Sequence, residues 1–315
     1  MLTRMAGYDN WKIVALTFPL TLTFGPLFLN LTLGQSGVFL LLSVLLLGEI
    51  LKNRSGYLEI FALTMWVIAS GAKIYPVLWI GCFPLLKRWR TFIIAGALCL
   101  TAFGLVAFLR PKANADYWFH FLPNQTREFA SGISVDDQSL SGFLSRIMTS
   151  NSYTLPGLDV QERREVKWVL PWDFSAQSIR YFSLVLILLL GAGVVFSWIR
   201  NNGQTPEGIL YSGVLFSLLL FPHMERYNHI VVLPALVWLW KQKALYRHLT
   251  VIVYGLFGLS RLNHLWALLP SPIGPLASGF GLLGVLMLLG GLSFALVHSK
   301  NPLETKEAVA PPTGL

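Results

Sequence analysis

The sequence predicts an all-α fold, a polytopic bundle of transmembrane helices with one large extracytoplasmic loop that contains short interfacial helices. Of its 315 residues, 54% are hydrophobic and only 12% are charged, whereas soluble domains have about 25% charged residues. The chain also contains about ten apolar runs, and about 20 apolar residues suffice to cross a bilayer. This composition excludes a soluble enzyme, a secreted disulfide scaffold and a nucleic-acid-binding protein.

The apolar runs divide the chain into four segments. We expect transmembrane helices over 1–109 and 179–299, a polar extracytoplasmic loop over 110–178, and a disordered cytoplasmic tail over 300–315. Several runs are shorter than a full span, which a polytopic bundle tolerates better than a lone helix does. The runs cover 13–33, 36–51, 57–72, 74–86, 91–109, 179–199, 207–221, 228–240, 246–268 and 276–297.

The basic residues predict the orientation in the membrane. If every run crosses, the loops on one face hold 13 Lys and Arg residues, whereas the short loops on the other face hold only Lys73 and Arg226. Because Lys and Arg collect in cytoplasmic loops, we expect the first face in the cytoplasm. This topology accounts for the net charge of +9. The expected location is therefore the cell membrane, with membrane lipids and no nucleic acid among the partners.

Two polar motifs lie at the predicted outer ends of apolar runs. Lys73 precedes Ile74-Tyr75-Pro76, and a lysine there either snorkels to the interface or binds an anion such as a phosphate. Gln35 lies in Gly34-Gln35-Ser36, where it either caps a tight turn or hydrogen-bonds to a sugar hydroxyl. Both motifs face the same side in the predicted topology.

The loop over 110–178 contains the adjacent carboxylates Asp136 and Asp137. Adjacent carboxylates raise one another's affinity for a proton, which suits a general base, although such a pair in an exposed loop is also typical of a solvated turn. Residues 139–148 predict a short helix with Arg146 on its polar face. The mixed charges of 161–167 predict a solvated helix face.

A second polar segment joins two apolar runs at 221–229. It contains His223, Glu225, Arg226 and His229, so Arg226 or His229 could contact a phosphate or a sugar, and an ordinary polar hairpin is the alternative. The spacing fits no zinc rule, so no metal ligand is assigned. Asn30 begins a glycosylation sequon, which is a weak pattern.

Several of these motifs, taken in order, resemble glycosyltransferase family 87. They are Gly34-Gln35, Lys73-x-Tyr75-Pro76, Trp89-Arg90 and Asp137-Gln138-Ser139-Leu140-x-Gly142-x-x-x-Arg146. The resemblance is densest over 25–150. It implies an integral-membrane enzyme of the GT-C type, in a group that includes polyprenyl-phosphate-mannose-dependent α-1,2-mannosyltransferases and related arabinofuranosyltransferases.

The resemblance also implies which residues form the site. Donor phosphate-binding residues would be Lys73, Tyr75, Arg146, Arg226 and His229. Acceptor-binding or sugar-binding residues would be Gln35, Gln138, Ser139 and His223. The family usually has more chain before the Gly-Gln motif, including an aspartate that acts as general base. Only 33 residues precede Gly34 here, so the chain resembles a member without that N-terminal portion, and Asp136 and Asp137 are the catalytic candidates.

The implied function is transfer of a mannose-like or arabinofuranose-like sugar from a polyprenyl-phosphate donor to a lipid-linked or glycan acceptor on the extracytoplasmic face. Some GT-C enzymes use a divalent metal and others do not, and the sequence leaves both open. Two alternatives to an enzyme also stay open, namely a lipid or solute transporter and a non-catalytic or truncated membrane subunit. A transporter would carry ionisable residues near the bilayer midplane, and the apolar runs here hold few.

Overall fold

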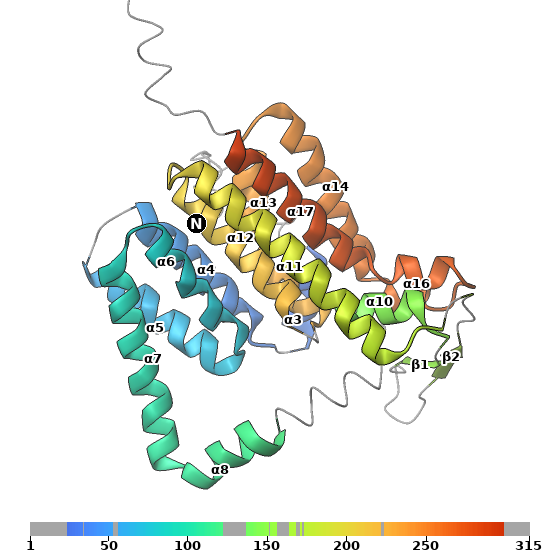
Figure 1. Ribbon diagram of the computed structural model, residues 1–315, viewed down its shortest axis with the longest axis horizontal. Coiled ribbons are helices and arrows are strands. Elements are labelled where there is room, and N and C mark those ends of the chain that lie inside the picture. The colour runs from blue at the N-terminus through green and yellow to red at the C-terminus, as the bar shows by residue number, and fades with distance from the viewer. Residues whose placement is uncertain are drawn as a thin grey trace, which may run out of the picture.

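The computed structural model is a bundle of helices with one short β-hairpin (Figure 1). Its helices follow the predicted apolar runs closely, which confirms the helical fold class. The structure describes residues 24–33, 35–52, 56–121, 137–150, 152–155, 164–167, 171, 173–221 and 224–298. Asp136, His223, Gly34 and the tail over 300–315 lie outside the described residues.

The first half of the chain contributes eight described helical elements. They are α3 (Gly25–Thr32), α4 (Gly37–Lys52), α5 (Gly56–Ala72), the 3₁₀ helix η1 (Tyr75–Gly81), α6 (Cys82–Leu85), α7 (Trp89–Leu109), α8 (Pro111–Asp116) and the π-helical turn η2 (Tyr117–Phe121). Pro76 at the start of η1 and Pro84 within α6 interrupt the regular helical hydrogen-bond pattern, which explains why α5 continues as short irregular helices.

The loop and the second half contribute the other described elements. They are α10 (Leu140–Met148), the strands β1 (Ser152–Leu155) and β2 (Arg164–Lys167), α11 (Ala176–Asn201), α12 (Pro206–Leu220), the 3₁₀ helix η3 (Arg226–Val232), α13 (Leu233–Trp240), α14 (Ala244–Ser260), α15 (Asn263–Trp266), α16 (Ile273–Ala277) and α17 (Phe280–Val297). The helix predicted over 139–148 is confirmed as α10. The helix predicted over 161–167 is wrong for Arg164–Lys167, which pair antiparallel with β1, because mixed charges alone do not separate a helix face from a hairpin.

Local sequence signals set several helix boundaries. The Ser139 and Ser175 side chains cap α10 and α11 by accepting hydrogen bonds from backbone N–H groups one turn later. α11 ends at Asn202, whose φ of 49° is left-handed and breaks the helix. α12 then begins with Pro206, which needs no backbone hydrogen bond in the first turn.

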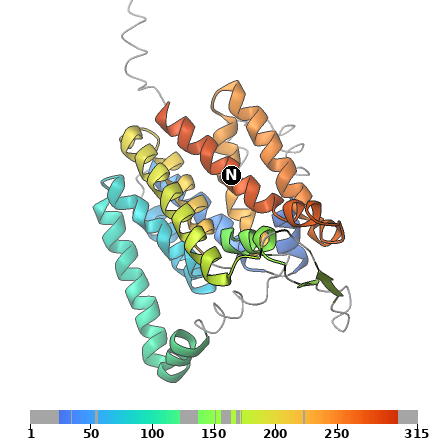
Figure 2. The ribbon, with the colours of Figure 1, turned by 45° about the vertical axis from the view of Figure 1, so that its right-hand side comes forward.

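The core of the bundle lies around α12. Ten of its 15 residues are buried, and α12 packs against α4, α11, α17 and η1. By contrast, α7 buries only Thr91 and Ala95 and runs along one edge of the molecule (Figures 1 and 2). Its apolar side chains, such as Leu100 and Phe108, are about four-fifths exposed, at 78% and 82%. Exposed apolar side chains on a long helix are expected where the surroundings are lipid.

Three of the described helices are long and apolar enough to cross a membrane, namely α7, α11 and α17. Three shorter apolar segments lie at Gly56–Ala72, Tyr75–Leu85 and Pro206–Leu220. The molecule is therefore suited to a membrane, whereas the number of crossings stays a prediction.

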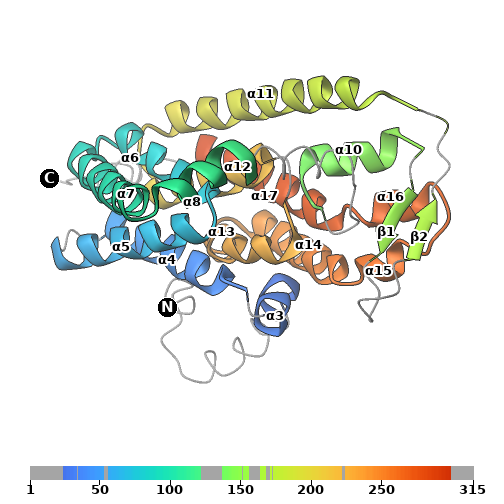
Figure 3. The ribbon, with the colours of Figure 1, turned by 90° about the horizontal axis from the view of Figure 1, so that it is seen from below.

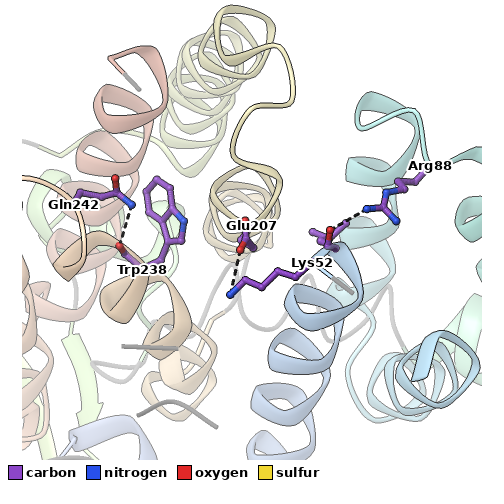
Figure 4. Close-up of polar contacts among 6 residues, drawn as sticks. Lys52, Arg88, Glu207, Trp238 and Gln242 are labelled. Atoms are coloured by element: carbon purple, nitrogen blue, oxygen red, sulfur yellow. Dashed lines mark hydrogen bonds and ion pairs between the residues drawn. The ribbon is translucent and has the colours of Figure 1, made fainter. Parts of the chain in front are cut away.

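The bundle has two ends, and α10, α16 and the two strands lie at one of them (Figure 3). At the end that we call the loop end, α5 and α12 finish, α17 begins, and α10, α16 and η3 pack. At the end that we call the ion-pair end, α4 finishes at Lys52 and α12 begins at Pro206. There the Lys52 ammonium lies 3.2 Å from the Glu207 carboxylate, and Arg88 donates to the Leu51 carbonyl over 2.9 Å (Figure 4).

Candidate active site

At the loop end, the Asp137–Ser139 turn is fastened to the chain that enters η3. The Asp137 Oδ1 accepts hydrogen bonds from the backbone N–H of Ser139 at 2.8 Å and of Met224 at 3.0 Å. The Gln138 N–H donates to the Met224 carbonyl over 2.6 Å, and Asp137 forms a β-bridge with Glu225. The loop over 110–178 and the polar segment after α12 are therefore joined by main-chain pairing.

The Asp-Gln-Ser-Leu-x-Gly motif has a clear structural basis in this turn. Ser139 caps α10 by accepting from the Gly142 N–H at 3.0 Å. A Cβ atom on Gly142 would collide with the Asp137 carboxylate, so only glycine allows the carboxylate to approach the helix this closely. One turn further along α10, the fully buried Arg146 donates from Nη1 to the Asp137 carbonyl over 2.5 Å. The residues of the motif thus bond to one another around Asp137.

Gln138 reaches from this turn to the start of α17. Its Nε2 donates to the Ser278 carbonyl over 2.8 Å, and its Oε1 accepts from the Leu282 N–H at 3.3 Å. The His229 ring lies beside it, because a Cβ on Gly281 would meet both Gln138 Oε1 at 2.8 Å and His229 Nδ1 at 3.2 Å. His229 is 1% exposed, and its Nδ1 has no hydrogen-bond partner in the described part of the chain.

Arg226 joins η3 to the end of α14. Its Nη1 donates to the backbone carbonyls of Ser260 at 3.0 Å and Arg261 at 3.1 Å. The last carbonyls of a helix lack partners within the helix, so a buried guanidinium there satisfies them and offsets the negative end of the helix dipole. Arg226 therefore fixes the position of η3 against α14.

Lys73 lies at the other side of η3, at the end of α5. Its backbone N–H still donates to the Ala69 carbonyl at 2.9 Å, and the chain after it is held by Trp66, whose Nε1 donates to the Pro76 carbonyl over 2.7 Å. Tyr75 is buried between Trp79 and Phe221, with ring centroids 6.0 and 5.7 Å away. Lys73 is partly exposed, and its ammonium lies 3.5 Å from the Tyr227 hydroxyl.

Gln35 is connected to η3 through Asn30. The Gln35 N–H donates to the Asn30 carbonyl at 3.0 Å, and the Asn30 side chain donates from Nδ2 to the Tyr227 carbonyl over 2.5 Å. Asn30 is 1% exposed and lies where a Cβ on Gly37 would be. The Gly-Gln turn, α3 and η3 are thus tied together.

The structure brings most of the sequence-predicted residues to one segment, the chain from Phe221 through η3. Asp137 and Gln138 bond to Met224 or its neighbours, and Lys73 contacts Tyr227, whereas Arg146 and Arg226 donate to backbone carbonyls. Asp136 and His223 are outside the described residues. Three residues were not predicted from the sequence as part of the site, namely Asn30, Tyr227 and Gly281. Asn30 and Gly281 lie in apolar runs, and a polar Asn in such a run was the available signal.

No cluster of His, Cys, Asp and Glu side chains suited to a metal occurs within the described residues. The hydrogen-bond donors of the site are instead cationic side chains, a tyrosine hydroxyl and amides. Such a donor set suits an anion and hydroxyl groups.

A helical bundle with three long apolar helices among its described residues and polar side chains gathered at one end is suited to a membrane protein. The sequence model of glycosyltransferase family 87 matches residues 1–222, and the chain belongs to this family. It is accordingly a membrane glycosyltransferase that acts on a sugar donor and an acceptor in the membrane.

The match ends before η3, so Arg226, Tyr227 and His229 lie beyond the matched residues. Searches of curated proteins and of solved structures found no match. The evidence for the role of η3 is therefore its contacts in this molecule.

Proposed function

We propose that the protein transfers a mannose-like or arabinofuranose-like sugar from a polyprenyl-phosphate donor to a lipid-linked or glycan acceptor at the loop end, on the extracytoplasmic face. The observation that carries the proposal is the position of Lys73. Lys73 is partly exposed at the end of an apolar helix, and its ammonium lies beside the Tyr227 hydroxyl of η3. A lipid phosphate at the end of this helix would contact the Lys73 ammonium and nearby hydrogen-bond donors.

The proposed reaction breaks the bond between the sugar C1 and the phosphate oxygen and forms a new bond from C1 to an acceptor hydroxyl oxygen. The acceptor proton goes to a base, and the polyprenyl phosphate leaves as an anion. Cationic groups that stabilise the leaving phosphate lower the barrier, because negative charge develops there in the transition state. Lys73 is proposed for this role.

We assign the two buried arginines to positioning. Arg146 holds the Asp137 turn on α10, and Arg226 holds η3 on α14. Their charge still adds a positive potential at the loop end, which favours a phosphate over longer distances. Tyr75, buried behind Lys73, supports the same segment.

The sugar would be bound by the amide and ring groups around Gln138. Gln138 and His229 meet beside Gly281 at the start of α17, and Ser139 follows Gln138 in the chain. The buried His229 Nδ1 can form a hydrogen bond with a hydroxyl group. Gln35 and His223 are proposed for the acceptor side.

The base is proposed to be a carboxylate other than Asp137. The Asp137 Oδ1 already accepts two backbone hydrogen bonds, which suits a residue that shapes a turn. Asp136, its neighbour in the chain, stays the catalytic candidate. Replacing Asp137 by Asn keeps an oxygen acceptor, so we expect transfer to fall by at most about tenfold, whereas removal of a general base typically costs about 10²–10⁴-fold.

The test is a transfer assay in liposomes with a radiolabelled polyprenyl-phosphate sugar. Wild-type protein should attach the label covalently to an acceptor lipid or glycan, and Lys73→Ala should abolish transfer at unchanged expression. Lys243→Ala, which removes an exposed lysine at the ion-pair end, is the matched control and should remain active. Passage of unmodified donor across the bilayer without covalent transfer would favour a transporter and contradict the proposal.

A further inference from the structure

The contact between Lys73 and Tyr227 joins two segments that are distant in the sequence. The Lys73 Nζ lies 3.5 Å from the Tyr227 hydroxyl and 5.2 Å from the centroid of the Tyr227 ring. The side chain thus meets both the polar tip and the π face of one tyrosine. A cation over an aromatic ring at this distance is attracted by the ring, so the ammonium is oriented before any anion arrives.

The two arginines of the site make a different kind of contact. Arg146 and Arg226 are buried and direct Nη1 donors at backbone carbonyls. Lys73 and Tyr227 are both partly exposed, and their contact is between side chains. Because both side chains are partly exposed, a phosphate that approaches the loop end can reach the Lys73–Tyr227 pair.

Asn30 fixes the main chain of Tyr227. Its Nδ2 donates to the Tyr227 carbonyl over 2.5 Å and to the Pro26 carbonyl over 3.0 Å. Its own carbonyl accepts from Gln35, and Gly37 leaves room for the side chain. Because Asn30 is 1% exposed, it can act on a ligand only through Tyr227 and Gln35.

We propose that Tyr227 is a further donor phosphate-binding residue, whose hydroxyl binds the same lipid phosphate as the Lys73 ammonium, and that Asn30 is its positioning residue. This inference rests on the proposed function. A phenol hydroxyl and an ammonium are both donors, and a phosphate has enough acceptor oxygens for both. Holding the lysine over the ring before binding reduces the side-chain entropy that is lost on binding.

The test compares Tyr227→Phe and Tyr227→Leu in two measurements. One is the KM for the polyprenyl-phosphate sugar in the transfer assay, and the other is the Kd for sugar-free polyprenyl phosphate, measured by native mass spectrometry. Tyr227→Phe keeps the ring and should raise both constants about tenfold, as expected for a lost hydrogen bond to a charged group. Tyr227→Leu also removes the ring and should raise them further. Tyr57→Leu, which changes a 92% exposed tyrosine, should leave both unchanged.

The positioning role of Asn30 is tested with a matched asparagine. Asn30→Leu and Asn201→Leu each remove a buried amide that donates to a backbone carbonyl, the latter to Leu296 at 3.0 Å at the ion-pair end. Both should lower the melting temperature. Only Asn30→Leu should also raise the donor KM several-fold while kcat changes little, which a purely structural role would not do.

The outcomes separate this inference from the proposed function. If wild-type protein transfers sugar and neither Tyr227 variant changes KM or Kd by more than about twofold, the inference is overturned and the function stands. If wild-type protein transfers no sugar but binds the lipid phosphate in a Tyr227-dependent way, the proposed function fails and the phosphate site stands.

Discussion

The loop end and the ion-pair end differ in how deeply their charged side chains are buried. At the loop end, Arg146 and Arg226 are buried and their guanidinium groups satisfy backbone carbonyls. At the ion-pair end, Lys52 and Glu207 pair with each other while their side chains remain 40% and 16% exposed. The backbone explains the difference. The chain at the loop end includes a buried turn and the 3₁₀ helix η3, whose polar groups need partners away from water, whereas the charged groups of the ion-pair end lie at partly exposed helix ends.

The burial of each charge determines how much its removal should destabilise the protein. A buried charge that holds irregular backbone is part of the geometry of the site, and its loss leaves polar groups without partners. A partly exposed ion pair between regular helices is solvated on one side and contributes little. Substitutions at the two ends should therefore differ in size even when the chemistry removed is similar.

The largest expected difference is between Arg146→Ala and Arg88→Ala. Both arginines donate to a backbone carbonyl, but Arg146 is fully buried and Arg88 is partly exposed. Arg146→Ala should lower the free energy of unfolding by about 3–5 kcal/mol, because it removes a large buried side chain together with a charged hydrogen bond. Arg88→Ala should cost about 1 kcal/mol. Denaturant titration in detergent micelles, followed by tryptophan fluorescence, measures both.

Equal losses for the two arginines would contradict the distinction between the two ends. Arg146→Lys serves as a control for charge, because it keeps a cation but cannot reproduce the planar donor geometry of a guanidinium. We expect it to recover only part of the stability.

An intermediate difference is expected between two glycines of α17. A Cβ on Gly281 would press on Gln138 and His229, whereas Gly290 has nothing within 4 Å. Gly281→Ala should therefore cost about 1–3 kcal/mol by overpacking and should reduce transfer activity. Gly290→Ala should be neutral or slightly stabilising, since alanine favours a helix more than glycine does. Thermal unfolding and the transfer assay, run on both variants, give the comparison within one helix.

A Gly281→Ala protein with unchanged stability and activity would show that Gln138 and His229 are free to move. The contact at the start of α17 would then be loose, and the proposed sugar-binding role of Gln138 would lose its support.

The sequence predicted the helical elements and several polar residues of this site, but not the way in which they meet. Apolar runs define helices directly, so the predicted runs and the observed helices nearly coincide. The motif around Asp137 and Arg146 was also visible from its spacing. Its effect was not, because the hydrogen bond that the Met224 N–H donates to Asp137 links residues 87 positions apart, and no local pattern encodes such a pairing.

Asn30 and Tyr227 show even more clearly that contacts between distant residues could not be predicted from the sequence. In the sequence, Asn30 is the start of a sequon, and Tyr227 is one residue of the polar segment over 221–229. Their hydrogen bond joins residues 197 positions apart, and it fixes the main chain of the tyrosine that contacts Lys73. The strand β2 was not predicted either, because it is defined by its pairing with β1, a separate segment of the chain.

The smallest expected effect concerns the Lys52–Glu207 ion pair. A double-mutant cycle of Lys52→Met and Glu207→Gln should give a coupling energy of at most about 1 kcal/mol, because the pair is partly exposed. The coupling should fall further at high salt, where exposed charges are screened. Transfer activity should not change, since this pair lies at the far end of α12 from η3. A coupling above about 2 kcal/mol, measured by the same denaturant titration, would mean that the pair is shielded from solvent. The two ends would then stabilise the bundle by the same means, and the difference between them would lie only in the site that the loop end carries.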